Sequence, residues 1–166
     1  MILAFDTFYF DNQAKTVCVT FNDWNSSLQF DVFSETIKHS AAYTPGEFYK
    51  RELPCILSLL KAMNPEQIEA IIIDGFVFLD DDYKLGLGGH LYNHLEQKIP
   101  VIGVAKTNFA SIDQLKRPLL RGKSANPLYI TAIGIDVDEA LEKIRNLDGE
   151  FRIPTILKTL DGLTKA

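Results

Sequence analysis

The chain is poor in cysteine, in basic residues and in long apolar runs, and each shortage excludes a class of protein. Its two cysteines, Cys18 and Cys55, lack the spacing of a metal or redox motif and are expected to be buried. No apolar run approaches the roughly 20 residues needed to cross a bilayer. The first residues lack the basic segment of a signal peptide and soon reach an acid. We therefore expect a cytoplasmic protein with no membrane partner.

Length and charge are those of an ordinary globular protein, for which we expect a single domain over residues 1–166. The net charge of −5 argues against a protein that coats nucleic acid, but it allows an enzyme whose carboxylates bind a metal. One stretch is richer in basic residues and is expected either to face phosphate or to form a solvated loop. Its basic residues are Lys106, Lys116, Arg117, Arg121 and Lys123.

Two aspartates each follow a short apolar run with the composition of a buried strand. Asp6 ends the run 1–5, and Asp74 ends the run 70–73. The ends of such strands lie at the sheet edge, where loops open and ligands bind. Each aspartate taken alone is more simply explained as a turn former. If their strands are neighbours, however, the two carboxylates form a hard-oxygen site suited to Mg²⁺ or Mn²⁺.

The order of the predicted elements favours a mixed sheet with helices on its faces. Segments rich in Phe, Val, Ile and Thr predict a first group of antiparallel strands at 1–10, 14–21 and 27–37. Later strands are predicted at 68–74, 99–104 and 128–133. Helical spacing of apolar residues predicts helices at 47–64, 85–97, 137–147 and 155–163. This order is that of an α/β, ribonuclease-H-like fold.

Four further segments carry residues of the types that take part in catalysis or binding. Tyr43-Thr44-Pro45-Gly46 leads into Arg51-Glu52 at the front of a predicted helix. A glycine-rich stretch holds His90, a predicted strand runs into Lys106, and Arg152-Ile153-Pro154 lies near the end of the chain.

Each of these residues also has a purely structural explanation. Glu52 could complement a helix dipole, and Tyr43 could anchor a loop. His90 could pack where backbones approach closely, and Lys106 could be a solubilising residue. The residue types alone do not separate these explanations from a functional site.

In order and spacing, these segments resemble the endonuclease V family of metal-dependent nucleases, which act on deaminated purine (inosine) sites. The resemblance runs from Met1 to roughly Leu163 and rests on Tyr-x-Pro-Gly…Arg-Glu, Asp-Gly and Ile-Gly-Val-Ala-Lys taken together. It implies an α/β ribonuclease-H-like domain, a bound Mg²⁺ or Mn²⁺ ion and a nucleic-acid partner. It implies metal binding by Asp6 and Asp74, with Glu52 acting near the metal. It also implies a wedge beside the lesion base and residues lining the site, which are Tyr43, Thr44, Pro45, Gly46, His90 and Lys106.

The chain departs from the family pattern at two places. After Asp-Gly the family has Gln-Gly-x-Ala-His-Pro-Arg, whereas residues 76–82 read Phe-Val-Phe-Leu-Asp-Asp-Asp. The family's late strand ends in Ser-x-Gly-His, and Gly134 stands near the place of that metal-binding histidine. Either Asp136 or one of Asp80–Asp82 replaces the lost ligand, or catalysis is lost. Taken alone, the acidic triplet is more typical of an exposed turn.

Three functions follow as hypotheses. The leading one is a divergent Mg²⁺-dependent endonuclease that cuts DNA or RNA near inosine, in nucleic-acid repair or turnover. The alternative is a catalytically inactive module of the same fold that binds nucleic acid or protein. A third is a different ribonuclease-H-like hydrolase. Retention of Asp6, Glu52 and Asp74 favours the enzyme, whereas the missing histidine and the negative net charge favour the binding module.

Overall fold

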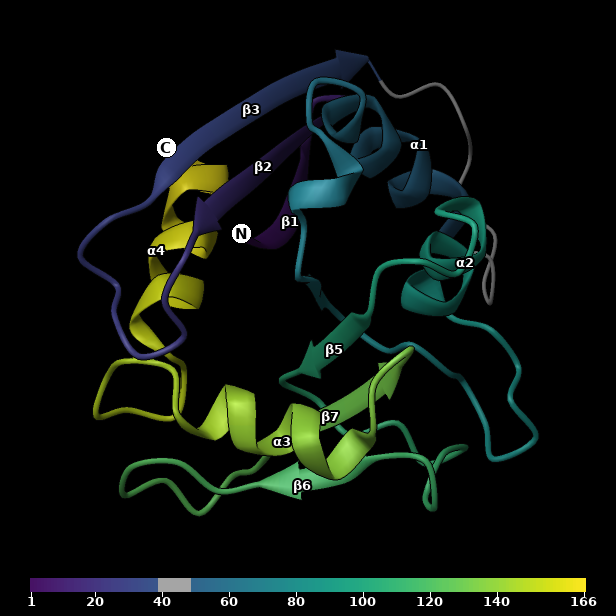
Figure 1. Ribbon diagram of the computed structural model, residues 1–166, viewed down its shortest axis with the longest axis vertical. Helices are drawn as coiled ribbons and strands as arrows, with labels where there is room; N and C mark the ends of the chain where they lie inside the picture. Colours follow the sequence, from purple (N-terminus) through teal and green to yellow (C-terminus); the bar gives the residue numbers. More distant parts are fainter. Residues whose placement is uncertain (39–48) are drawn as a thin grey trace.

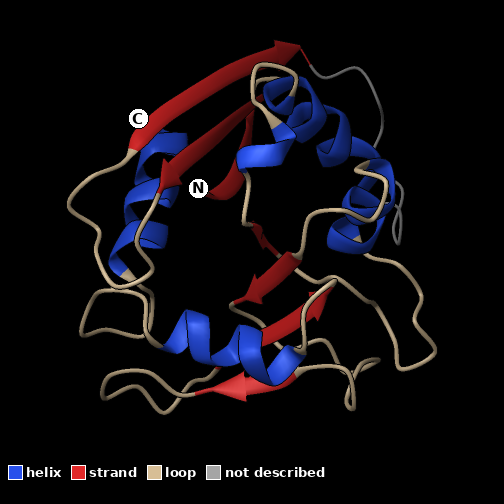
Figure 2. Ribbon diagram, in the orientation of Figure 1, coloured by secondary structure: helices blue, strands red, loops and turns tan. Residues whose placement is uncertain are grey.

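Seven strands form one mixed sheet, in the order β3-β2-β1-β4-β5-β7-β6 (Figure 1). The computed structural model describes residues 1–38 and 49–166. The strands are β1 Ile2–Phe10, β2 Gln13–Phe21, β3 Asp31–Lys38, β4 Ala70–Asp74, β5 Val101–Ala105, β6 Arg117–Leu119 and β7 Leu128–Ile133. β1, β4 and β5 run parallel at the centre, and the outer pairs are antiparallel. The expected mixed sheet with helices on its faces is confirmed (Figure 2).

The long antiparallel arm of β1, β2 and β3 begins with a tight hairpin. Asp11 and Asn12 both have positive φ, 45° and 59°, which is the backbone of the two-residue turns that match strand twist. β3 starts at Asp31, four residues later than predicted. The preceding residues form turns because Asp23 and Ser26 side chains accept hydrogen bonds from nearby backbone N–H groups.

Helices cover both faces of the sheet, and each face has its own hydrophobic core. α1 (Tyr49–Leu60) and α2 (Leu87–His94) pack on the face that carries Leu3 and Phe5. α3 (Val137–Arg145) and α4 (Thr155–Lys165) pack on the opposite face. A short 3-10 turn, η1 (Pro65–Gln67), precedes β4. Within the described ranges, no helix is long and apolar enough to span a bilayer.

α2 is shorter than predicted at both ends. Before it, Leu85 is bridged to Phe78, and Gly86 is the N-cap residue. After it, Glu96 has a positive φ of 59°, which a helix cannot accommodate. Gly88 is required inside the helix because a Cβ there would lie 2.7 Å from the Val77 side chain. The glycine-rich stretch therefore allows α2 to pack closely on the segment after β4.

The basic stretch around β6 does not form a common phosphate-facing surface. Arg117 pairs with Asp138 at 3.0 Å, and Lys116 donates to Asn108 at 2.6 Å. Arg121 is 6% exposed and donates to the carbonyl oxygens of Leu147, Gly149, Phe151 and Arg152. A count of charges could not reveal that these side chains hold loops and helices together.

Replacing Arg121 with methionine is expected to lower the free energy of unfolding by roughly 3 kcal/mol. Methionine fills similar space, but the buried carbonyl groups lose their donor and remain desolvated. Denaturant unfolding of Arg121→Met measures this loss. Lys123→Met is the control, because Lys123 is exposed and its replacement should leave stability near wild type. A loss for Arg121→Met no larger than for the control would contradict the structural role.

Candidate active site

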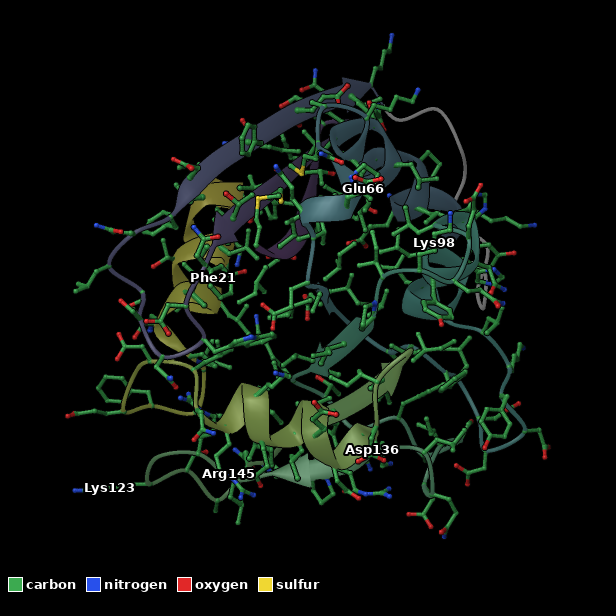
Figure 3. All side chains as sticks on the ribbon, viewed as in Figure 1. Phe21, Glu66, Lys98, Lys123, Asp136 and Arg145 are labelled. Atoms are coloured by element: carbon green, nitrogen blue, oxygen red, sulfur yellow. The ribbon has the colours of Figure 1, made fainter. Side chains whose placement is uncertain are left out.

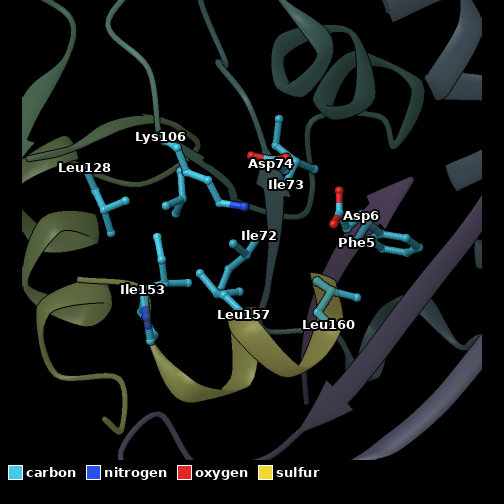
Figure 4. A pocket seen from close by; sticks show the side chains of 12 residues that line it. Phe5, Asp6, Ile72, Ile73, Asp74, Lys106, Leu128, Ile153, Leu157 and Leu160 are labelled. Atoms are coloured by element: carbon cyan, nitrogen blue, oxygen red, sulfur yellow. The ribbon is translucent and has the colours of Figure 1, made fainter. Parts of the chain in front are cut away.

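Three charged side chains meet at one edge of the parallel part of the sheet. The register of β1 and β4 brings Asp6 and Asp74 level on adjacent strands. Lys106 directly follows β5, the next strand. Because alternate residues share a face, all three point toward the side covered by α4. Figure 4 shows the Lys106 side chain extending toward Asp74, with Asp6 beside it.

A small cavity lies between these side chains and α4. Its volume is about 30 Å³, comparable with the share of liquid volume that one water molecule takes. Apart from the three charged groups, its lining is apolar. It comes from the strands β1, β4, β5 and β7 and from α4 with the residues just before it, and includes Ile72, Ile153, Pro154, Leu157 and Leu160 (Figure 4). Apolar walls strengthen the field of the charged groups. The cavity has room for an ion or a water molecule beside the two carboxyl groups.

The Asp6 carboxyl is held in a state that favours protonation. Asp6 is 8% exposed, and burial, together with the charge of Asp74, raises its pKa to about 7. The Thr7 backbone N–H donates to Oδ1 of Asp6 at 2.9 Å and partly opposes that rise. Burial also raises the pKa of Asp74, although Lys106 and a hydrogen bond with Asp6 oppose the rise. Two facing carboxyl groups repel each other when both are ionised, and a bound cation would offset that repulsion.

Glu52 reaches the same edge from α1, on the other face of the sheet. Its side chain is 3% exposed. Burial, followed by the charges of Asp6 and Asp74, raises the pKa of Glu52 to about 8. A hydrogen bond with the Thr7 side chain and the charge of Arg51 act in the opposite direction. Three acids predicted from the sequence thus influence one another's ionisation.

A fourth acid, Asp161 of α4, belongs to this group and was missed by the sequence analysis. Its charge raises the pKa values of both Asp6 and Asp74. Lys165, one turn later, donates to Asp161 at 3.1 Å. The feature that could have identified Asp161 is its place in a helix in which the nearby residues Ile156, Leu160 and Thr164 are buried. Asp161 was overlooked because a single acid in an amphipathic helix normally belongs to the solvent face.

Neither Asp136 nor any of Asp80–Asp82 lines the cavity beside Asp6 and Asp74. Asp136 follows β7, which runs antiparallel to β5, and therefore lies at the opposite end of the strands from Lys106. Figure 3 shows Asp136 beside α3. There it caps α3 by accepting from the N–H groups of Asp138 and Glu139. Asp80 accepts from two nearby N–H groups, and Asp81 accepts from those of residues 113–115. These acids shape turns and loops, as their residue types already allowed.

The remaining predicted residues occupy different positions. His90 lies in α2 and stacks on Tyr49 of α1, with ring centroids 3.6 Å apart; burial is the main cause of its lowered pKa. Its ring is not part of the cavity lining. Tyr43, Thr44, Pro45 and Gly46 lie outside the described residues. Arg152 donates to the backbone carbonyls of Lys106 and Pro127, which ties the segment before α4 to the strand end that carries the lysine.

The donor chemistry fits a hard divalent cation. Mg²⁺ in proteins commonly takes one or two carboxylates and keeps water or substrate phosphate in its other positions. Asp6 and Asp74 supply such a pair, and their raised pKa values express the charge that a cation would offset. Across residues 1–38 and 49–166, no three His, Cys, Asp or Glu side chains converge into a complete set of ligands.

The mixed sheet, with acids at the edge of its central strands, has the architecture of ribonuclease-H-like proteins. Argonaute of Marinitoga piezophila, solved with a 5′-OH guide RNA, aligns with a TM-score of 0.53 at 11% identity, covering 99% of this chain and 29% of that chain. The endonuclease V of Streptomyces avermitilis aligns with a TM-score of 0.76 at 24% identity, over 99% of this chain and 79% of that chain. These likenesses establish the ribonuclease-H-like fold.

A second endonuclease V aligns more closely in shape. The protein of Ciona intestinalis, solved with a DNA that contains an inosine followed by a ribo-adenosine, gives a TM-score of 0.80 at 19% identity, over 99% of this chain and 84% of that chain. The model of the endonuclease V family matches residues 1–134. No individual curated protein matches this chain. The chain belongs to the endonuclease V family, whose nucleases generally depend on a divalent metal.

Proposed function

We propose that this protein is an endonuclease that uses Mg²⁺ or Mn²⁺ to hydrolyse a phosphodiester bond near inosine in DNA or RNA, in nucleic-acid repair or turnover. The observation that carries the proposal is the meeting of Asp6, Asp74 and Lys106 around an ion-sized cavity, with Glu52 in electrostatic contact. Family membership supports the nuclease class. The inosine-containing DNA bound by the Ciona intestinalis protein supports the choice of substrate.

Each residue has a part that follows from its position. Asp6 and Asp74 would hold the cation, which when bound would polarise a phosphate and make a water molecule more acidic. Lys106 extends into the same space and neutralises charge on a phosphate oxygen (Figure 4). Glu52, which is hydrogen-bonded to Thr7 and coupled electrostatically to both aspartates, would act near the metal through a bound water molecule. Water is excluded from the back of the cavity by the apolar side chains of β4 and α4.

We assign recognition of the base to the segment that precedes α1 in the sequence. We assign the wedge role to Tyr43, Thr44, Pro45 and Gly46, which precede α1 in the sequence. His90 supports this assignment because it stacks on Tyr49, the first residue of α1. An aromatic and proline-containing segment suits the space left when a base leaves its stack.

A nuclease assay tests the proposal directly. The purified protein is incubated with Mg²⁺, with Mn²⁺ or with EDTA, on single strands of DNA and RNA that either contain or lack one inosine. Cleavage next to inosine that requires the metal is the expected result. Failure to cleave any of these strands, in protein shown to be folded, would instead favour the inactive binding module, in keeping with the loss of the family's His-Pro-Arg run.

Asp161→Asn is expected to lower the cleavage rate about tenfold. The change removes a negative charge from the cation's surroundings and releases Lys165, whose charge already acts on Asp74. A free ammonium group beside Asp74 competes with the cation, and a tenfold loss corresponds to about 1.4 kcal/mol. Raising the Mg²⁺ concentration should recover part of the rate. The same change at exposed Asp31, on the edge strand, should leave the rate unchanged. Equal rates for both variants would remove Asp161 from the site.

A further inference from the structure

Two phenylalanines continue β1 beyond the acid site. Phe8 and Phe10 follow Asp6 at steps of two residues, so all three share one face of the sheet. The two rings stack with centroids 5.9 Å apart and an angle of 19° between their planes. Each side chain remains 37% exposed, which is unusual for large apolar groups placed next to one another.

Basic residues accompany this aromatic pair. The sheet register places Lys15 directly beside Phe8 and Lys38 in the same cross-strand row as Phe10. Lys15 donates to the Ala166 carbonyl at 3.0 Å, so α4 reaches as far as this row. Exposed aromatic faces alongside ammonium groups have the composition of surfaces that bind single-stranded nucleic acid, where bases stack and lysines attract the backbone.

The pair is also at a suitable distance from the site. A strand advances roughly 3.4 Å per residue, which puts Phe8 about 7 Å and Phe10 about 14 Å beyond Asp6. A nucleic-acid strand whose phosphate lies between Asp6 and Lys106 therefore places its next nucleotides over these rings if it runs along β1. The two rings share the sheet face of the candidate site.

We propose that Phe8 and Phe10 form a stacking surface for the unpaired bases that flank the cleaved bond in a single-stranded region of the substrate. This inference rests on the proposed function, because it takes the Asp6–Asp74 edge as the place of the phosphodiester. Stacking is tolerant of base identity, since every base has a π-face. The surface thus adds affinity for an unstacked strand, while selection of inosine remains at the site itself.

The test compares binding and cleavage in variants that remove the aromatic faces. The double variant Phe8→Leu, Phe10→Leu keeps apolar bulk, so that the hairpin folds, but it has no π-face. Its binding to a short single-stranded oligonucleotide with one central inosine is measured by fluorescence anisotropy in EDTA, where cleavage does not interfere. We expect affinity about tenfold weaker than wild type. Restoring aromatic faces with Phe8→Trp, Phe10→Trp should recover the affinity.

Changing the substrate tests whether the two rings contact the bases that flank inosine. Replacing the nucleotides on one flank of inosine by abasic residues should weaken wild-type binding about tenfold and should have little further effect on the leucine variant. Phe33→Leu is the matched control, because Phe33 is 42% exposed but lies on the opposite sheet face, in the row of Phe5. Its binding should equal wild type. Abasic substitutions on either flank that weaken both proteins equally would overturn the stacking role, as would an equal loss in the Phe33 variant.

The outcomes separate this inference from the proposed function. Wild-type protein that binds the oligonucleotide through the phenylalanines but does not cut it in Mg²⁺ or Mn²⁺ would overturn the nuclease and keep the stacking surface. Protein that cuts beside inosine with unchanged affinity in the leucine variant would overturn the stacking surface alone. Wild-type protein that neither binds nor cuts would overturn both.

Discussion

Asp74→Asn is expected to abolish cleavage of an inosine-containing strand while leaving the fold intact. Asparagine has the shape of aspartate but lacks its charge, so it cannot neutralise a divalent cation shared with Asp6. Loss of such a ligand removes several kcal/mol of transition-state stabilisation, a rate loss of roughly a thousandfold. The measurement is the single-turnover cleavage rate with Mg²⁺ and with Mn²⁺, alongside thermal unfolding without metal.

Asp82→Asn is the matched control for this change. Asp82 is exposed and belongs to the acidic triplet that the sequence offered as a source of replacement ligands. The structure gives its neighbours Asp80 and Asp81 roles in loop hydrogen bonds, so the control should cleave at the wild-type rate. Asp74→Asn protein that cuts normally would rule out Asp74 as a ligand. A similar loss in Asp82→Asn would move the metal site to the triplet.

Without metal, the protein is expected to become less stable as pH rises from 5 to 8. The pKa of Asp6 is raised to about 7 and that of Glu52 to about 8, whereas both carboxyls ionise near pH 4 when the chain unfolds. In this window the folded state holds more protons than the unfolded state, so stability falls with increasing pH. The two shifts together correspond to a loss of roughly 6 kcal/mol, or about 12–24 °C in Tm.

Thermal unfolding in EDTA across this pH range measures the effect. Asp6→Asn removes one buried ionisable group together with its repulsion of Asp74 and Glu52, and should flatten the curve. Glu142→Gln, which changes an exposed acid on α3, should keep the wild-type slope. Mg²⁺ added at pH 8 should raise Tm, because the cation binds the ionised carboxylates of the folded state. A Tm that increases from pH 5 to pH 8 in EDTA would contradict the raised pKa values.

Local patterns explain which parts of the fold were predictable. The apolar runs before Asp6 and Asp74 specified buried strands, and Asp11-Asn12 specified the hairpin turn. The start of β3 was misplaced because side chains at 23 and 26 compete for backbone hydrogen bonds, an effect that strand propensity omits. β6 was missed because three residues of edge strand carry little periodicity of their own.

The residues of the candidate site were also predictable only in part. Asp136 was expected near the metal because the family resemblance places a metal-binding histidine close to Gly134, but β7 runs antiparallel to β5 and carries Asp136 to the opposite end of the strands. Asp161 was missed because its meaning depends on which face of α4 meets the sheet. Arg121 and Lys116 were indistinguishable by charge, although one lies buried among carbonyls and the other beside an aromatic ring.

The sequence by itself determined the strands that carry Asp6 and Asp74, the helix that carries Glu52 and the strand that leads to Lys106. Short-range periodicity and turn chemistry act between neighbours in the chain, so they can be recognised without the tertiary structure. Only the tertiary structure decided which acids share a site and in what ionisation state. Strand direction and helix docking bring together residues far apart in the sequence, such as Asp6, Asp74 and Asp161. Their raised pKa values then arise from shared burial and mutual repulsion, which exist only once the chain has folded.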